Sequence, residues 1–118
     1  MKKVAIVMRK APYGSVYSAE GYRSIMGLGV FEMDVAVAFV DDGVYVLLKG
    51  QNPAKLDMKP LGDGFPMLSD FDVKQFYVHA ESLAERGLTA DDLVMGVEVL
   101  DSAGISAALA GCDVVLPF

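Results

Sequence analysis

Five short apolar runs divide the chain, separated by longer segments in which apolar residues recur at helical spacing. The runs are rich in valine and are bounded by charges, glycines or prolines, a pattern typical of β-strands. The run at 34–40 is almost wholly apolar, as expected for a parallel strand covered on both faces. The predicted strands are residues 3–8, 34–40, 75–80, 95–100 and 113–116.

Three of the intervening segments have the features of helices. Apolar residues recur every three or four positions within 16–31, and Ser15 or Ser18 is available as the N-cap. Residues 81–86 and 102–111 predict two further helices, each ended by a glycine.

The part of the chain between the second and third strands is less regular. Residues 44–48 fit either a strand or a single helical turn, 50–64 predict an irregular connection with two prolines, and 65–71 are weakly helical. Because strands otherwise alternate with helices, the chain predicts one α/β domain over residues 1–118. We expect a three-layer α/β/α sandwich around a five-stranded, mostly parallel sheet.

The composition limits where the protein works and what it binds. Apolar residues make up 53% of the chain and the mean hydropathy is +0.39, which predicts an oligomer that covers part of its apolar surface. No apolar run is long enough for a membrane helix, and no signal-peptide cleavage site follows the first strand. The single cysteine, Cys112, suits a reducing compartment, so we expect a cytoplasmic protein. A net charge of −6 disfavours direct nucleic-acid binding.

Polar residues follow several of the predicted strands, and in open parallel sheets ligands gather outside the carboxyl ends of the strands. The loop after the first strand could offer backbone N–H groups to an anion. It has one glycine and no following lysine, so an ordinary turn is the favoured interpretation. The candidate residues at this edge are Arg9, Pro12, Tyr13, Gly14, Ser15, Asp41, Asp42, His79, Glu81, Asp101 and Ser102.

His79 is the only histidine and stands at the end of the third predicted strand. Neighbouring carboxylates could make it a base or a metal ligand, but without a defined ligand spacing a structural role is favoured. Cys112 is expected to be a buried, inert thiol at the start of the last strand, beside Asp113. The sequence lacks the spacing of a Ser-His-Asp triad, a CxxC pair or an HExxH motif, and we predict neither a metal nor a cofactor.

Six short segments are spread along the whole chain: 11–14 (APYG), 20–21 (EG), 41–44 (DDGV), 47–53 (LLKGQNP), 81–88 (ESLAERGL) and 113–118 (DVVLPF). Together they resemble the DsrF/TusC branch of the DsrE/F-like sulfur-relay family, and the resemblance runs from end to end. It implies a subunit that supports the transfer of persulfide sulfur toward tRNA thiolation or dissimilatory sulfur metabolism. It also implies assembly with sibling DsrE-like and DsrH-like chains or self-association, and contact with sulfur donor and acceptor proteins.

The same resemblance bears on His79. In the family's sulfur carriers a cysteine ends the third strand, eight residues before the glycine of an Arg-Gly pair, and counting back from Gly87 gives His79. Because imidazole cannot hold a persulfide, the resemblance implies a non-carrier subunit, with uncertain enzymatic activity of its own. It places His79, Glu81, Arg86 and the loop 12–15 closest to the site on a partner's cysteine.

Two other interpretations of the residues stay open. One is a stand-alone homo-oligomeric protein that binds a small ligand or metal at the carboxyl edge near His79. The other is a flavodoxin-like sensor that binds a small ligand through the loop after the first strand.

Overall fold

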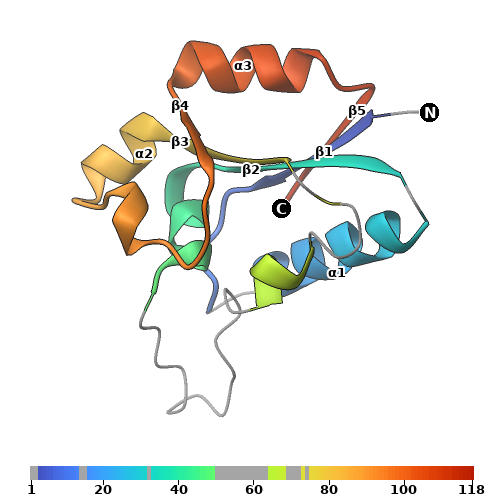
Figure 1. Ribbon diagram of the computed structural model, residues 1–118, viewed down its shortest axis with the longest axis horizontal. Helices are drawn as coiled ribbons and strands as arrows, with labels where there is room; N and C mark the ends of the chain where they lie inside the picture. Colours follow the sequence, from blue (N-terminus) through green and yellow to red (C-terminus); the bar gives the residue numbers. More distant parts are fainter. Residues whose placement is uncertain (1–2, 14–15, 32, 50–63, 69–72, 74) are drawn as a thin grey trace.

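Five parallel strands form a single sheet in the order β4-β3-β2-β1-β5 (Figure 1). The computed structural model describes residues 3–13, 16–31, 33–49, 64–68, 73 and 75–118. The strands are β1 (Lys3–Met8), β2 (Asp34–Phe39), β3 (Gln75–His79), β4 (Glu98–Leu100) and β5 (Val114–Pro117). The helices are α1 (Tyr17–Val30), α2 (Ala80–Glu85) and α3 (Ser102–Ala110), with 3-10 helices η1 (Asp41–Leu47) and η4 (Ala90–Asp92).

The two longer helices lie on opposite faces of the sheet, which confirms the predicted three-layer arrangement (Figure 1). α1 packs against β1 and β2, whereas α3 packs against β3 and β4. Since β4 and β5 occupy opposite edges of the sheet, the connection through α3 crosses one whole face. Within the described part of the chain, no helix is long and apolar enough to span a membrane.

The core lies around β1 and β2, because these strands are covered on both faces. All residues of β1 after Lys3 and of β2 after Asp34 are buried, as the apolar runs predicted. Phe65, in a short 3-10 turn at 64–68, packs edge-on against Phe39 and Tyr22, with ring centroids 5.5 and 5.1 Å apart. Burying each large apolar side chain contributes roughly 1.5 to 3 kcal/mol, so this cluster anchors the turn and α1 to the sheet.

The start of α1 differs from the expected N-cap. The helix begins at Tyr17, and its N-cap residue, Val16, has no side-chain cap. Ser18 is buried inside the first turn, where its hydroxyl lies within hydrogen-bonding distance of the carbonyls of Lys10 (3.0 Å) and Ala11 (2.9 Å). It therefore ties the loop after β1 to the helix instead of capping the helix. Ser15 lies outside the described residues.

The structure also differs from the prediction at residues 44–48 and at the start of the fourth strand. Of the two possibilities left for 44–48, the helical one holds to Leu47 within η1, and Leu48 forms an antiparallel bridge with Leu93. β4 is shorter than the predicted strand 95–100 and begins at Glu98, while Met95 and Val97 before it pack against the core. Most of the expected irregular connection at 50–64, and part of the weakly helical 65–71, lie outside the described residues.

Two glycines provide a matched test of this packing. A Cβ on Gly43 would lie 1.8 Å from the backbone oxygen of Met8, whereas one on Gly27 would meet no described atom within 4 Å. We expect Gly43→Ala to lower the free energy of unfolding by about 3 kcal/mol or more. Gly27→Ala should raise it by about 0.5 to 1 kcal/mol, because alanine is the better helix former. Urea unfolding of both variants measures this, and equal effects would contradict the close contact at Gly43.

Candidate functional site

The pairing of β3 with its two neighbours determines which residues meet at the carboxyl edge. Val78 is paired with Phe39 of β2, and His79 with Leu100 of β4. The chain leaves β2 two residues later at Asp41 and enters α3 at Ser102, two residues beyond Leu100. His79 therefore lies between the start of η1 and the start of α3.

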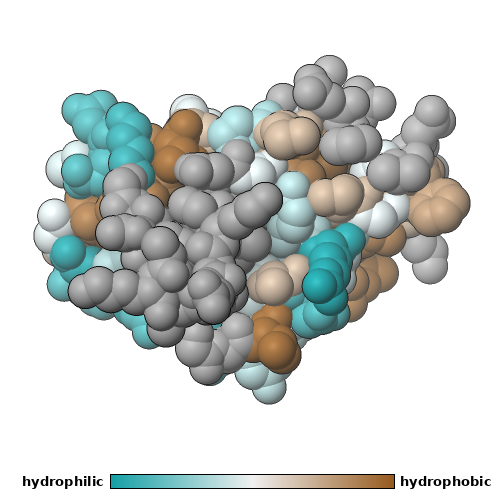
Figure 2. All heavy atoms as spheres, turned by 90° about the horizontal axis from the view of Figure 1, so that it is seen from below, coloured by the Kyte–Doolittle hydropathy of each residue, from teal (hydrophilic) through white to brown (hydrophobic). Residues whose placement is uncertain are grey.

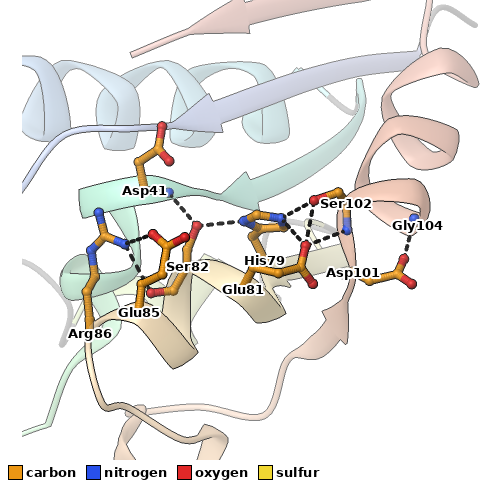
Figure 3. Close-up of polar contacts among 9 residues, drawn as sticks. All are labelled: Asp41, His79, Glu81, Ser82, Glu85, Arg86, Asp101, Ser102 and Gly104. Carbon is orange, nitrogen blue, oxygen red and sulfur yellow. Dashed lines mark hydrogen bonds and ion pairs between the residues drawn. The ribbon is translucent and has the colours of Figure 1, made fainter.

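Ser82, in the first turn of α2, connects His79 to η1 (Figure 3). Its Oγ lies 2.6 Å from His79 Nδ1 and accepts a hydrogen bond of 2.9 Å from the backbone N–H of Asp41. Asp41 is the one described non-glycine residue with a positive φ, at 50°. The serine hydroxyl therefore holds a backbone conformation that few residue types tolerate well.

Glu81 and Ser102 occupy the other ring nitrogen of His79. Nε2 lies 2.8 Å from Ser102 Oγ and 2.8 Å from Glu81 Oε2. Ser102 donates both its hydroxyl (2.5 Å) and its backbone N–H (3.0 Å) to that same carboxylate oxygen. One side chain on β3 and one at the start of α2 thereby fix the start of α3.

In the neutral imidazole, these partners determine the tautomer of His79. An ionised carboxylate only accepts hydrogen bonds, and the proton of Ser102 already points to Glu81, so Nε2 carries the ring hydrogen. Nδ1 is then the acceptor of the Ser82 hydroxyl. Both nitrogens of the ring are occupied, and the His79 side chain is only 18% exposed. A free general base requires a nitrogen that can reach a substrate, and this arrangement does not provide one.

The start of α3 carries two carboxylates. Asp101 is the N-cap and accepts a hydrogen bond of 2.8 Å from the N–H of Gly104. Glu81 reaches the same helix end from α2. The hydrogen bond from the Ser102 hydroxyl, with further contributions from the Ser102 N–H and from His79, lowers the pKa of Glu81 below its ordinary value of 4.5. Glu81 is therefore ionised at neutral pH.

Arg86 does not face His79, although the resemblance placed both near one site. Its guanidinium donates to Asp42 Oδ1 from Nε (3.2 Å) and from the second terminal nitrogen (2.9 Å). Nη1 donates to the carbonyl of Ser82 at 3.1 Å, and the group stacks over the ring of Tyr45. Through Asp42, Arg86 thus binds the end of α2 to η1. It adjoins the His79 cluster at Ser82 (Figure 3).

Cys112 lies at the opposite, amino edge of the sheet. The expectation that it opens the last strand is wrong, since β5 begins at Val114. The Cys112 N–H completes the final turn of α3 by donating to Leu109, and its thiol donates to the carbonyl of Ala108 at 3.5 Å. It is half-buried, not fully buried as expected.

The structure brings some of the predicted residues together and separates others. His79, Glu81 and Ser102 share one cluster, and the backbone of Asp41 joins it through Ser82. Pro12 and Tyr13 follow β1, which is separated from β3 by β2, while Gly14 and Ser15 lie outside the described residues. Among the described residues, no three His, Cys, Asp or Glu side chains come together as a metal site requires.

Sequence reasoning missed Ser82, which contacts His79, Asp41 and Arg86 within the cluster. A signal for it existed, because Ser82 is three residues beyond a histidine at the junction of a strand and a helix. Side chains three or four positions apart meet on one side of a helix turn.

Together, the open parallel sheet and the polar cluster beyond its third strand define an α/β/α protein with its candidate site at the carboxyl edge. The chain belongs to the DsrE/DsrF-like family, whose model matches residues 2–118.

Two named relatives match along nearly their whole length. The chain is 38% identical to the intracellular sulfur oxidation protein DsrF of Allochromatium vinosum, covering 100% of this chain and 97% of that protein. It is 34% identical to protein TusC of Escherichia coli, covering 100% of both. Among solved structures, the YchN protein of Escherichia coli matches with a TM-score of 0.86 and 26% identity over 100% of both chains.

Removing the Ser82 hydroxyl tests the cluster directly. Ser82 is 2% exposed, so Ser82→Ala leaves both Asp41 N–H and His79 Nδ1 without this partner. We expect a loss of about 1 to 3 kcal/mol in the free energy of unfolding. The exposed Ser106→Ala on α3 is the control, with an expected change within about 0.5 kcal/mol. Nitrogen NMR of the sole histidine should also show a changed Nδ1 signal in Ser82→Ala, and an unchanged one would refute the contact.

Glu81 predicts a pH dependence of stability. Because folding lowers its pKa, the ionised carboxylate stabilises the folded chain fully above its unfolded pKa, near 4.5. This contribution is lost as the pH falls through the lower folded pKa. The thermal midpoint of the wild type should therefore exceed that of Glu81→Gln most at neutral pH, and the difference should shrink below about pH 4.5. A difference that is constant from pH 7 to 3 would exclude this role for the charge.

Proposed function

We propose that this chain is a non-carrier subunit of an intracellular sulfur-relay complex that transfers persulfide sulfur. The complex would support tRNA thiolation or dissimilatory sulfur metabolism. The names of two relatives, an intracellular sulfur oxidation protein and TusC, support this assignment. The chain's single, half-buried cysteine and the membership in a family with these relatives support a place in the cytoplasm.

The proposal rests on the side chain at position 79 and on its hydrogen bonds. The family resemblance places the carriers' cysteine there, whereas this chain has an imidazole with both nitrogens hydrogen-bonded. Persulfide transfer needs an exposed thiolate that another sulfur can approach in line. The sole cysteine lies at the other edge of the sheet, so the carboxyl edge of this chain offers no sulfur nucleophile.

The role left for the chain is to hold a surface next to a partner's reactive cysteine. Sibling DsrE-like and DsrH-like chains are the proposed partners, and sulfur donors and acceptors would approach the assembled complex. The carboxyl edge, with Glu81, Asp42, Arg86 and the loop after β1, is the proposed lining of that shared site. Sulfurtransferase activity then belongs to the complex, with no cofactor or metal on this subunit.

The proposal is tested by charging the purified chain with a persulfide donor and measuring its intact mass. Wild-type protein should gain little or no sulfur, because the Cys112 thiol is half-buried against α3. His79→Cys in a Cys112→Ser background should gain sulfur and react faster with alkylating agents than Cys112 does. Its thiol would occupy part of the space that the imidazole fills, beside two serine hydroxyls.

The Cys112→Ser chain is the blank for this experiment, since it contains no thiol. If wild-type Cys112 takes up sulfur readily and the cysteine at position 79 does not, the chain is a carrier of a different design and the proposal is wrong.

A further inference from the structure

The first residues of β3 and β4 are open to solvent. α3 packs against both strands, yet Gln75 and Glu98, which begin them, are exposed. On the opposite side of the molecule, the surface around α1 mixes hydrophobic and hydrophilic residues (Figure 2). The starts of β3 and β4 differ from that mixed surface, because they border a hollow that is lined by strand residues.

The hollow has a volume of about 500 Å³, which lies within the range of small-molecule sites. Its lining comes from β3, from β4 and from the two residues just before β4. Among the described residues of this lining, one is acidic and none is basic, so the carboxylate there is not neutralised from within the hollow. The lining residues are Gln75, Phe76, Tyr77, Gly96, Val97 and Glu98.

Tyr77 and Glu98 stand side by side in this hollow. They are partners in the parallel pairing of β3 with β4, so their side chains leave the same face of the sheet, from strands about 4.8 Å apart. Tyr77 also lines a space under α3 that has no room for water, together with Ala38 and Leu109. The tyrosine therefore borders packed protein on one side and the hollow on the other.

The polar groups of this pair are not used inside the subunit. The described residues offer no hydrogen-bond or ionic partner to the Glu98 carboxylate or to the Tyr77 hydroxyl. A carboxylate and the face of an aromatic ring both attract positive charge. The net charge of −6 adds a general attraction for cations. The chemistry of the hollow therefore favours a cationic ligand over an anionic one.

Gly96 keeps the hollow open. It belongs to the lining, and a Cβ at this position would meet no described atom within 4 Å. Its backbone does not demand glycine, because Gly87 is the glycine with a positive φ in the described part of the chain. A larger side chain at position 96 would fit the subunit and would occupy space that the glycine leaves free.

We propose that this hollow binds a small organic cation, an ammonium or guanidinium group that carries an apolar substituent. The cation lies between the Glu98 carboxylate and the Tyr77 ring, and the apolar part packs against Val97. Because the carboxylate is exposed and the ring half-buried, we expect dissociation constants in the millimolar range. A free amine and an arginine side chain of another protein both offer this chemistry. The inference does not depend on the sulfur chemistry proposed above.

Amide NMR of the wild-type chain during titration with phenethylamine tests the site. The signals of Tyr77, Gly96 and Glu98 should shift. The matched anion phenylpropionate and the neutral phenylethanol should bind about fivefold more weakly or worse, because they lack the positive charge. N-acetylarginine amide, titrated in parallel, represents an arginine side chain of another protein. Tighter binding of phenethylamine identifies a free amine as the ligand, and tighter binding of the capped arginine identifies a protein side chain.

Two variants with matched controls separate the site from general charge attraction. Glu98→Gln should weaken the binding of phenethylamine about fivefold, and Gly96→Leu should weaken it by filling the hollow. Glu20→Gln and Gly27→Leu make the same changes on α1, on the opposite face of the sheet, and should bind like the wild type. All four positions are exposed or half-exposed, so the circular dichroism spectra should match that of the wild type.

Three results would overturn the proposal. The first is that none of the three amide signals shifts up to about 20 mM phenethylamine. The second is that phenylpropionate binds as well as phenethylamine, and the third is that Glu98→Gln binds phenethylamine as well as Glu20→Gln does. The proposed function would stand in each case, since sulfur uptake is measured on Cys112 and position 79.

Discussion

The imidazole of His79 joins three segments that the chain itself connects only through crossovers. It bonds through Ser82 to the backbone of η1, and through its other nitrogen to Glu81 and the first residue of α3. Each neutral hydrogen bond contributes only about 1 kcal/mol, but a group left unpaired beside the buried Ser82 would cost more. The ends of β2, β3 and β4 are therefore held in one geometry by mutual satisfaction of donors and acceptors. Arg86 adds a second connection between α2 and η1 through Asp42.

This fixed geometry limits what the carboxyl edge can do. A nucleophile or base must leave one atom free to approach a substrate, and in sulfur transfer that atom is a thiolate. Both ring nitrogens of His79 are instead hydrogen-bonded to neighbouring secondary-structure elements. The edge is consequently suited to presenting a constant shape and an acidic surface to another molecule, with Asp41 and Asp42 exposed beside the cluster.

The apolar pattern predicted all five strands. β1 and β2 bury nearly every side chain because they are covered on both faces, whereas the edge strands β4 and β5 are largely exposed and still form valine-containing apolar runs. It was less accurate where a distant partner decides the structure. Serine is a common N-cap residue, but Ser18 is buried against the loop after β1, and its hydroxyl bonds to carbonyls of that loop instead. Residues 44–48 are apolar enough for a strand, yet the segment is helical to Leu47 and Leu48 forms an antiparallel bridge with the distant Leu93.

The candidate site was predictable only as an edge of the sheet. His79, Glu81 and Ser102 could be placed at strand ends from the sequence, but their meeting depends on the pairing of His79 with Leu100. Strand register arises from long-range packing and leaves no local signal. For the same reason Arg86, five residues from Glu81, could not be assigned to Asp42 in advance.

Two glycines of α1 differ in whether packing within the subunit requires them. Gly21 is required by Met8 inside the subunit, so its cost to the helix is offset by a closer approach to the sheet. Gly27 incurs the same intrinsic cost at an exposed position where a side chain would fit. On the side of α1 that faces the sheet, packing therefore demands a glycine, whereas on the exposed side no described atom does.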